Sequence, residues 1–547
     1  MNTQADFGVL YGQKTTEDAL LIYSSYEDAK ASPQTGDFIV LTPKNEGSTK
    51  FLARVEAEIY DEDPIFKSQD KTLIAVHYAR IAERELSERD KQKMFSYTYK
   101  VKILGTYTDN GQSIVFTTAV RKLPIVSYIA RHLNKREIES ILNKTNENGV
   151  QIGHLCVGET VFHEKGPILF DINKLREKRT MIFAQSGFGK TNLVKVLVKN
   201  MTNDTSYGKL IFDLNGEYFL RGTKTYGLGD IDEKAARENI VVYTDKALPD
   251  QYKDSKRFVS GGKVLLNMHA HLTVGDILSF GSGFSGVMEA FLSYLADEEV
   301  SDFIQNIDEY VADPKQLHIK YPDFFTKNKE ASAQTTIAAI RKRVRHLIDE
   351  GKGLHSESSQ LVEDVFKFLK QGKTVIVDLS LKDNMDASII STILVRKLFD
   401  NNKKEYTSNK PGGVVNTVVF VEEAQNVLSE EFVKSNANPF VRVAKEGRKF
   451  GLGLVAITQR PSAISEEIRT QAENFFAFHM GNSDDIRALV KSNVNYDGVI
   501  SNFIQRETIP GNLYMVSSDQ AFALPVRVSE FEKLVGDKVY TESKFSQ

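Results

Sequence analysis

The sequence predicts an α/β protein with a mainly parallel sheet, preceded by a smaller β-rich domain. After about residue 150, continuously apolar runs alternate with long helical segments, which is typical of strands buried on both faces of a parallel sheet. Before residue 125, short apolar or alternating runs are separated by turn-forming residues, which is typical of a small barrel or sandwich. The length of 547 residues allows two to four domains of about 150 residues each.

The β-rich region, residues 1–125, is expected to form an N-terminal β-barrel. Turn signals such as Asp109-Asn110-Gly111 separate its runs, and the charged stretch Ile81–Met94 has helical character. Residues 126–150 are expected to be a linker that contains a short helix at Lys135–Ile141. The expected strands are Phe7–Tyr11, Ala19–Tyr23, Gly36–Leu41, Phe51–Ile59, Phe95–Leu104 and Ser113–Thr118.

The second region is expected to be one α/β core that a helical insertion interrupts. We expect the core to occupy residues 151–269 and 369–530, with the insertion at 270–368 and a C-terminal tail at 531–547. The expected core strands are Thr180–Ala184, Lys209–Leu214, Ile240–Thr244, Thr374–Leu379, Asn416–Val421, Gly453–Thr458 and Phe475–Met480, followed by the late strands Gly511–Ser517 and Phe522–Val528.

Composition and charge exclude several classes of protein. Hydrophobic residues make up 41% and charged residues 26%, which excludes a disordered chain or a fibrous one. A single cysteine, Cys156, cannot form an internal disulfide, and no run approaches the roughly 18 apolar residues of a membrane span. The first residues lack the features of a signal peptide, so we expect a cytoplasmic protein without a membrane segment. The net charge of −3 means that any contact with nucleic acid must come from a local patch.

The strongest motif is a phosphate-binding loop at residues 184–191. Gly187 and Gly189 allow the tight turn in which backbone N–H groups converge on phosphate oxygens. Lys190 would contact the β- and γ-phosphates, and the Thr191 hydroxyl would ligate Mg²⁺. An apolar strand precedes the loop and a helix follows it, as this motif requires. The expected nucleotide-binding residues are Gln185, Ser186, Gly187, Phe188, Gly189, Lys190, Thr191 and Asn192.

Carboxylates and an amide follow other predicted strands. Glu422 and Glu423 end an apolar strand, at the edge where ligands bind in open α/β sheets. One of them can hold Mg²⁺ and the next can polarise the attacking water. Gln459, at the end of another strand, can sense the γ-phosphate if that strand lies beside the one that carries Glu423. Asp213 ends a further strand and is the third candidate Mg²⁺ ligand, after Thr191 and Glu422.

Basic residues in two places have more than one interpretation. Arg448 and Arg442 are candidates for an arginine that completes the site of a neighbouring subunit, and the alternative is an ordinary basic helix end. The apolar spacing of Ile337, Ile340 and Val344 predicts a helix that basic residues surround. That basic surface is either a solvated face or one that meets a neighbouring subunit or DNA.

Taken in order, these motifs resemble the HerA branch of the HerA/FtsK ATPases. The resemblance is carried by the phosphate loop, Asp213-Leu214-Asn215-Gly216-Glu217-Tyr218, Glu422-Glu423-Ala424-Gln425, Glu446-Gly447-Arg448-Lys449-Phe450-Gly451 and Thr458-Gln459-Arg460-Pro461-Ser462. The N-terminal barrel is similar to the HAS-barrel of that family. Two positions depart from the family pattern: Ala184 stands where glycine is usual, and Gln425 stands where histidine is frequent.

The resemblance implies a RecA-like P-loop core in a homo-hexameric ring that hydrolyses ATP with Mg²⁺ between subunits and moves double-stranded DNA through its pore. It implies that Lys190 and Thr191 bind nucleotide and metal, that Glu423 activates water and that Glu422 is the metal-side carboxylate. Gln459 would be the γ-phosphate sensor and Arg448 the arginine supplied to the neighbouring subunit. Family members also act with a separate nuclease or a sirtuin-type NADase, in DNA-end processing or antiphage defence. No constellation for either activity is visible in this chain.

Two other functions remain open at this point. A regulatory ring scaffold would assemble and gate a partner effector without processive movement on DNA. A conjugation or secretion ATPase would move protein or a DNA–protein complex, and the lack of a membrane segment argues against it.

Overall fold

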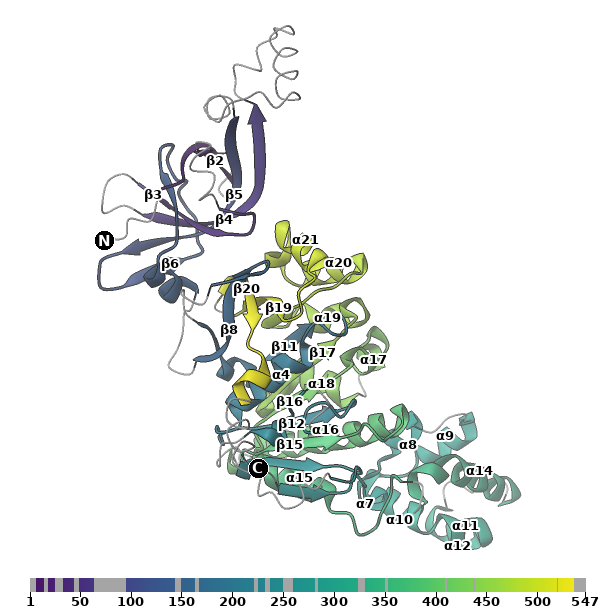
Figure 1. Ribbon diagram of the computed structural model, residues 1–547. Helices are drawn as coiled ribbons and strands as arrows, with labels where there is room; N and C mark the ends of the chain where they lie inside the picture. Colours follow the sequence, from purple (N-terminus) through teal and green to yellow (C-terminus); the bar gives the residue numbers. More distant parts are fainter. Residues whose placement is uncertain are drawn as a thin grey trace, which may run out of the picture. The chain divides into compact units, whose positions relative to one another are not determined.

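The computed structural model describes most of the chain. The described residues are 6–13, 18–24, 33–43, 49–62, 95–142, 149–162, 167–220, 225–231, 237–248, 259–280, 284–322, 330–349, 353–408, 411–435, 438–518 and 520–535. They form two compact units, and the course of the chain is drawn in Figure 1. The first unit comprises residues 1–171, 184–188 and 474–528, and the second comprises 172–183, 189–473 and 529–547.

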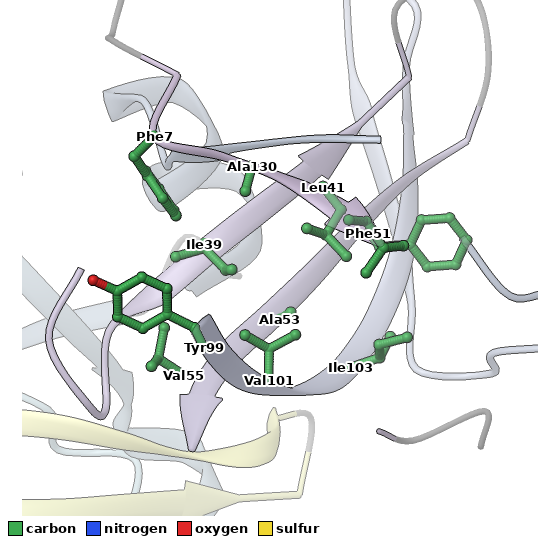
Figure 2. Close-up of a cluster of buried hydrophobic side chains, with 11 residues drawn as sticks. Phe7, Ile39, Leu41, Phe51, Ala53, Val55, Tyr99, Val101, Ile103 and Ala130 are labelled. Carbon is green, nitrogen blue, oxygen red and sulfur yellow. The ribbon is translucent and has the colours of Figure 1, made fainter. Parts of the chain in front are cut away.

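The first unit begins with a closed antiparallel β-barrel. Its strands follow the order β2-β1-β7-β3-β4-β5-β6, and an additional pairing of β2 with β5 closes the ring. Figure 2 shows apolar side chains of this barrel gathered in one core, among them Ile39, Val101 and Tyr99. The strands are β1 (Gly8–Gln13), β2 (Asp18–Ser24), β3 (Phe38–Thr42), β4 (Lys50–Glu62), β5 (Phe95–Asp109), β6 (Ile114–Thr117) and β7 (Ile129–His132).

One part of the barrel lies where the sequence suggested a linker. β7 pairs with β1 and with β3, so residues 129–132 are an integral strand of the barrel. The strand is only four residues long, so its pattern is too short to be recognised without its partners. The short helix α3 (Lys135–Glu137) and a π-helical turn (Ile138–Leu142) follow, where a helix was expected. The expected helix Ile81–Met94 lies outside the described residues.

The first unit also contains an antiparallel sheet built from distant segments. Its order is β10-β8-β20-β19-β18, with β9 (Thr160–Val161) paired to β8. Two of these strands are the late strands expected from the sequence. The bounds are β8 (Gly149–Val157), β10 (Pro167–Asp171), β18 (Asn474–Ala477), β19 (Asn512–Ser517) and β20 (Gln520–Val528), and the helices nearby are α20 (Ser483–Ser492) and α21 (Val499–Arg506).

The second unit is built on a parallel sheet. Its strands follow the order β14-β13-β15-β12-β16-β17-β11, and every neighbouring pair is parallel. The sheet confirms the predicted α/β core, and its central strands are fully buried, as their unbroken apolar runs indicated. The bounds are β11 (Arg179–Phe183), β12 (Gly208–Asp213), β13 (Ile240–Tyr243), β14 (Val259–Gly262), β15 (Thr374–Asp378), β16 (Thr417–Val421) and β17 (Leu452–Thr458).

Helices of this unit follow the strands in βα fashion. α4 (Lys190–Met201) follows β11, α16 (Asn384–Thr407) follows β15, and α18 (Pro439–Glu446) lies between β16 and β17 in the chain. The remaining helices outside the insertion are α15 (Leu361–Lys370), α17 (Glu430–Ser435) and α19 (Glu466–Arg469). No helix among the described residues combines the length and apolar character that crossing a bilayer requires.

β12 carries a buried lysine. The Lys209 side chain is fully buried, and its ammonium donates to the backbone oxygens of Asp204 and of Gly372, the latter at 3.0 Å. Burial lowers the pKa of Lys209 to about 7, and the nearby positive charge of Arg176 acts in the same direction. This lysine therefore penalises the folded state whenever it is charged.

The helical insertion follows β14 in the chain. Ile337, Ile340 and Val344 of α14 are fully buried, so the apolar stripe packs inside the insertion. Arg341 on the same helix pairs with Asp308 and with Asp349. The described helices are α7 (Met268–His271), α8 (Val274–Phe280), α9 (Gly286–Leu292), α10 (Asp297–Gln305), α11 (Ile307–Ala312), α12 (Pro314–Lys320) and α14 (Glu330–Ile348).

Candidate active site

The phosphate loop joins β11 to α4 with the backbone that its glycines permit. Gly187 and Gly189 have φ values of +84° and +106°, in the left-handed region that favours glycine. Ala184 is fully buried and is not among the described non-glycine residues with positive φ. Alanine therefore fits at this position without strain. α4 begins at Lys190, so the N–H groups of its first turn face the loop.

Other parts of the loop are anchored by hydrogen bonds. Within the first unit, the Gln185 amide donates to the His479 carbonyl at 2.9 Å, and the Phe188 and His479 ring centroids lie 4.4 Å apart. Within the second unit, the Asn192 side chain donates to the Ser529 carbonyl and accepts from the Phe531 amide. The Asn192 side chain thus holds the C-terminal segment, which leaves its backbone for any contact with nucleotide.

Glu422 is a buried carboxylate at the end of β16. It is 8% exposed, and the Tyr218 hydroxyl donates to its Oε1 at 2.8 Å. Burial, together with the neighbouring carboxyl of Asp213, raises the pKa of Glu422 to about 7, which the Tyr218 hydrogen bond opposes. A cation bound beside Glu422 would favour the ionised form of its carboxylate, as a metal ion does for the carboxylates that ligate it.

Glu423 has an unusual backbone and a well-defined side chain. Its φ is +45°, one of three non-glycine residues with positive φ among those the structure describes. Gln459 Nε2 donates to its Oε1 at 3.0 Å, and Gln425 Nε2 donates to its Oε2 at 2.6 Å. Thr458 in turn donates to Oε1 of Gln425 at 2.5 Å. The strained backbone and the two amides together aim this carboxylate in one direction.

The pairing of strands explains how these residues meet. β16 and β17 are parallel neighbours, as the expectation for Gln459 required. β12 pairs with β16 on its other side, which brings the segment after Asp213 to the same edge of the sheet. Lys190 lies within electrostatic reach of Glu423, Glu422 and Glu217. Burial lowers the pKa of Lys190, and these three carboxylates oppose that shift by favouring its charged form.

Asp213 does not have the place expected of a metal ligand. Its carboxylate is fully buried and accepts from the backbone amides of Gly216, Glu217 and Tyr218 at 2.7, 3.1 and 3.0 Å. Both of its oxygens are therefore used to hold the turn after β12, and burial raises the pKa of Asp213. A role of Asp213 as an Mg²⁺ ligand stays a prediction, and in this structure its carboxylate holds the turn.

The turn presents Glu217 instead. Glu217 is exposed, and its Oε2 accepts a hydrogen bond of 2.8 Å from the Thr191 hydroxyl. Thr191, Glu217 and Glu422 thus offer oxygen atoms around Lys190, a donor set that suits Mg²⁺. From the sequence, Glu217 belongs only to a motif string without a role of its own, and Gln425 is only a departure from the family pattern. Both residues could have been assigned to the site if the order of the strands β12, β16 and β17 in the sheet had been known.

The two candidate arginines differ in their surroundings. Arg442 pairs with Asp400 at 2.9 Å, and its guanidinium lies 4.2 Å from the centre of the Phe399 ring. Arg442 is therefore engaged inside its own chain. Arg448 is exposed on the short 3₁₀ turn Gly447–Phe450 that follows α18.

The parallel sheet, the phosphate loop after β11 and the paired carboxylates after β16 of the same sheet define a P-loop ATPase with a RecA-like core. Residues 150–398 match the family model described as the central domain of the helicase HerA. The chain is 25% identical over 418 residues to the "DNA double-strand break repair helicase HerA" of Sulfurisphaera tokodaii, covering 76% of this chain and 75% of that protein. It is 24% identical over 422 residues to the HerA of Saccharolobus solfataricus, with the same coverage of both. The chain is thus similar to HerA helicases, by the family model over residues 150–398 and by these relatives over about three quarters of its length.

Two solved structures align with this chain at low sequence identity. The bacterial conjugative coupling protein TrwB, lacking its first 70 residues, aligns with a TM-score of 0.41 and 12% identity, over 71% of this chain and 92% of that chain. VirB4 of Thermoanaerobacter pseudethanolicus aligns with a TM-score of 0.40 and 10% identity, over 70% of this chain and 97% of that chain.

Proposed function

We propose that this protein is an ATP-driven hexameric DNA translocase or helicase of the HerA type, acting with a separately encoded nuclease or sirtuin-type NADase. The proposal rests first on one observation: Glu423 has a strained backbone and a carboxylate held by two amide donors, at the same edge of the sheet as Lys190. Strain and fixed hydrogen bonds at a carboxylate are typical of a catalytic position rather than a structural one.

Each residue of the site has a definite role in this proposal. The backbone of residues 185–192 cradles the phosphates, and Lys190 neutralises the charge that develops on the γ-phosphate. Glu423 orients the attacking water and accepts its proton, while Gln459 couples Glu423 to the presence of the γ-phosphate. Mg²⁺, when bound by Thr191, Glu217 and Glu422, would supply further charge stabilisation for the phosphates.

Arg448 would complete the site of the adjoining subunit. It is exposed, and an arginine inserted from a neighbour stabilises transition-state charge without being fixed in the site beforehand. A ring of six subunits also resolves the difficulty of the net charge of −3. One lysine per subunit would place about six positive charges along a pore, enough for salt-dependent contact with the DNA phosphates.

The relatives support the substrate class, because the two HerA proteins compared above are named as DNA double-strand break repair helicases. We extend that substrate class, double-stranded DNA, to this chain. An effector enzyme would be a separate protein that docks on the N-terminal barrels of the ring. DNA-end processing and antiphage defence are the two pathways in which such a pair would act.

The rate of ATP hydrolysis with and without double-stranded DNA tests the proposal. A translocase should hydrolyse ATP several-fold faster with DNA, and the stimulation should fall as salt rises. Glu423→Gln provides the inactive control, since it keeps the shape of the side chain but removes the base. A rate that is the same with and without DNA would contradict translocation and favour an ATP-regulated scaffold that gates its partner.

A further inference from the structure

Two segments meet where the helical insertion leaves and rejoins the core. The Leu266 amide donates to the Leu354 carbonyl at 2.9 Å, and the Ser356 amide donates back to the Leu266 carbonyl at 3.0 Å. Asn267 adds a side-chain hydrogen bond of 3.0 Å to the carbonyl of Glu357. We call these two segments, residues 264–271 and 353–359, the root of the insertion. The root holds together parts of the chain that are almost ninety residues apart.

The root gathers three metal-ligating side chains. His269, His355 and Glu357 each offer one ligand atom, and these atoms all lie within 4.8 Å of one another. The two imidazole rings are 4.4 Å apart between centroids, and His269 Nδ1 lies 3.3 Å from Glu357 Oε1. From these contacts we propose that the root of the insertion is a binding site for a divalent transition-metal ion of the Zn²⁺ class.

The choice of metal follows from the ligands. Two imidazoles with one carboxylate are a set that Zn²⁺ takes, whereas Mg²⁺ prefers oxygen ligands alone. The His269 and His355 side chains are 12% and 3% exposed, while that of Glu357 is 68% exposed. The ion would therefore sit at the surface between two mostly buried rings, with the exposed carboxylate closing over it and water completing its coordination.

The backbone around His355 supports either tautomer of its ring. His355 Nδ1 lies 3.1 Å from the Met268 amide nitrogen and 3.3 Å from the Leu266 carbonyl oxygen. Without a metal, Nδ1 can accept the Met268 N–H. With a metal on Nε2, Nδ1 must carry the proton and can donate to the Leu266 carbonyl. A carbonyl that receives the second N–H of a metal-bound imidazole is the usual support for such a ligand.

The neighbouring histidine shows a different arrangement. His271 Nε2 lies 3.3 Å from Glu363, and its carbonyl accepts from Arg396 of α16 at 2.8 Å. His271 therefore connects the root to the core of the second unit rather than to the three-residue cluster. An ion at His269, His355 and Glu357 would close the root on its other side and hold the whole insertion in one orientation.

Metal binding by the full-length chain tests this proposal. The protein is freed of metal with a chelator, dialysed, and titrated with Zn²⁺ alone, and with Co²⁺ for its absorption spectrum. We expect one high-affinity equivalent per chain and a melting temperature that rises with Zn²⁺ concentration. Glu357→Gln and His269→Ala should each weaken binding roughly tenfold or more. His318→Ala, an exposed histidine of α12, is the matched control and should bind as the wild type does.

The two variants keep the test decisive. His269 is mostly buried, so its alanine variant can lose stability, whereas the exposed Glu357 can be changed without opening the core. Hydrogen exchange gives a second measurement: Zn²⁺ should slow exchange at the Leu266 and Ser356 amides in the wild type and not in Glu357→Gln. Absence of a high-affinity equivalent, or equal affinity in Glu357→Gln and the wild type, would overturn the proposal.

Discussion

Gln459 Nε2 donates a hydrogen bond of 3.0 Å to Oε1 of Glu423, although the two residues are 36 positions apart in the chain. The bond joins the ends of two parallel neighbours, β16 and β17. Gln425 holds the other oxygen of the same carboxylate, so both oxygens have fixed donors. In the mechanism that we propose, the amide of Gln459 would transmit the presence of a γ-phosphate to Glu423, the proposed base.

Replacing Gln459 by alanine should slow ATP turnover while ATP affinity stays nearly unchanged. The carboxylate would keep its position near Lys190 but lose one of its two orienting donors. We expect a fall of roughly 10- to 100-fold in kcat. Steady-state hydrolysis and fluorescent-nucleotide binding check the two quantities separately, with the exposed Asn426→Ala as control. A loss of affinity with normal kcat would contradict the sensor role.

Lys190→Ala should abolish ATP binding or lower turnover by at least about 100-fold, because no other cation would face the phosphates from the loop. Lys199→Ala, on the same helix, is the matched control. Circular dichroism should show that both variants keep the fold. Near-normal hydrolysis by Lys190→Ala would refute the assignment of the nucleotide site.

Glu217→Gln should raise the Mg²⁺ concentration needed for half-maximal hydrolysis roughly tenfold. The exposed carboxylate that now accepts from Thr191 would become a neutral amide, which is a weaker ligand for a hard cation. A Mg²⁺ titration at saturating ATP measures the change, with the exposed Glu431→Gln as control. If Asp213 were the ligand, Glu217→Gln would leave the titration unchanged.

Arg448→Ala should lower hydrolysis by roughly 10³-fold and leave nucleotide affinity largely intact, since the arginine would act only from a neighbouring subunit. Lys449→Ala, the adjacent exposed cation, is the control. Mixing Arg448→Ala with Glu423→Ala subunits should restore part of the activity, because some interfaces then contain both wild-type residues. No recovery in mixed rings would count against a role in trans.

The buried Lys209 makes stability depend on pH above neutrality. Its pKa of about 7 in the folded chain lies below the ordinary value of 10.5, so the unfolded chain binds more protons in this window. Stability should therefore rise with pH, by about 2 kcal/mol between pH 7 and pH 9 from this group. Urea unfolding at several pH values measures it, and Lys209→Met should show a smaller rise. Equal slopes in both proteins would show that Lys209 is charged when folded.

The sequence by itself was sufficient for the α/β class, the phosphate loop and the family resemblance. A phosphate loop is local: strand, glycines, lysine and helix are consecutive, so the backbone conformation of Gly187 and Gly189 follows from neighbouring residues. The buried strands were recognisable for the same reason, since an unbroken apolar run such as Val418–Val421 indicates by itself a strand that is buried on both faces.

Which side chains meet depends on how distant segments pack in the folded chain. This packing placed Asp213 inside a turn and Glu217 against Thr191, made β7 part of the barrel, and joined His269 to His355 and Glu357 at the root of the insertion. These contacts depend on the order of the strands in the sheet and on which distant segments come together. Neither can be deduced from the local pattern of apolar and polar residues. A motif consists of residues that are consecutive in the chain, whereas a site consists of residues from distant segments that packing brings together.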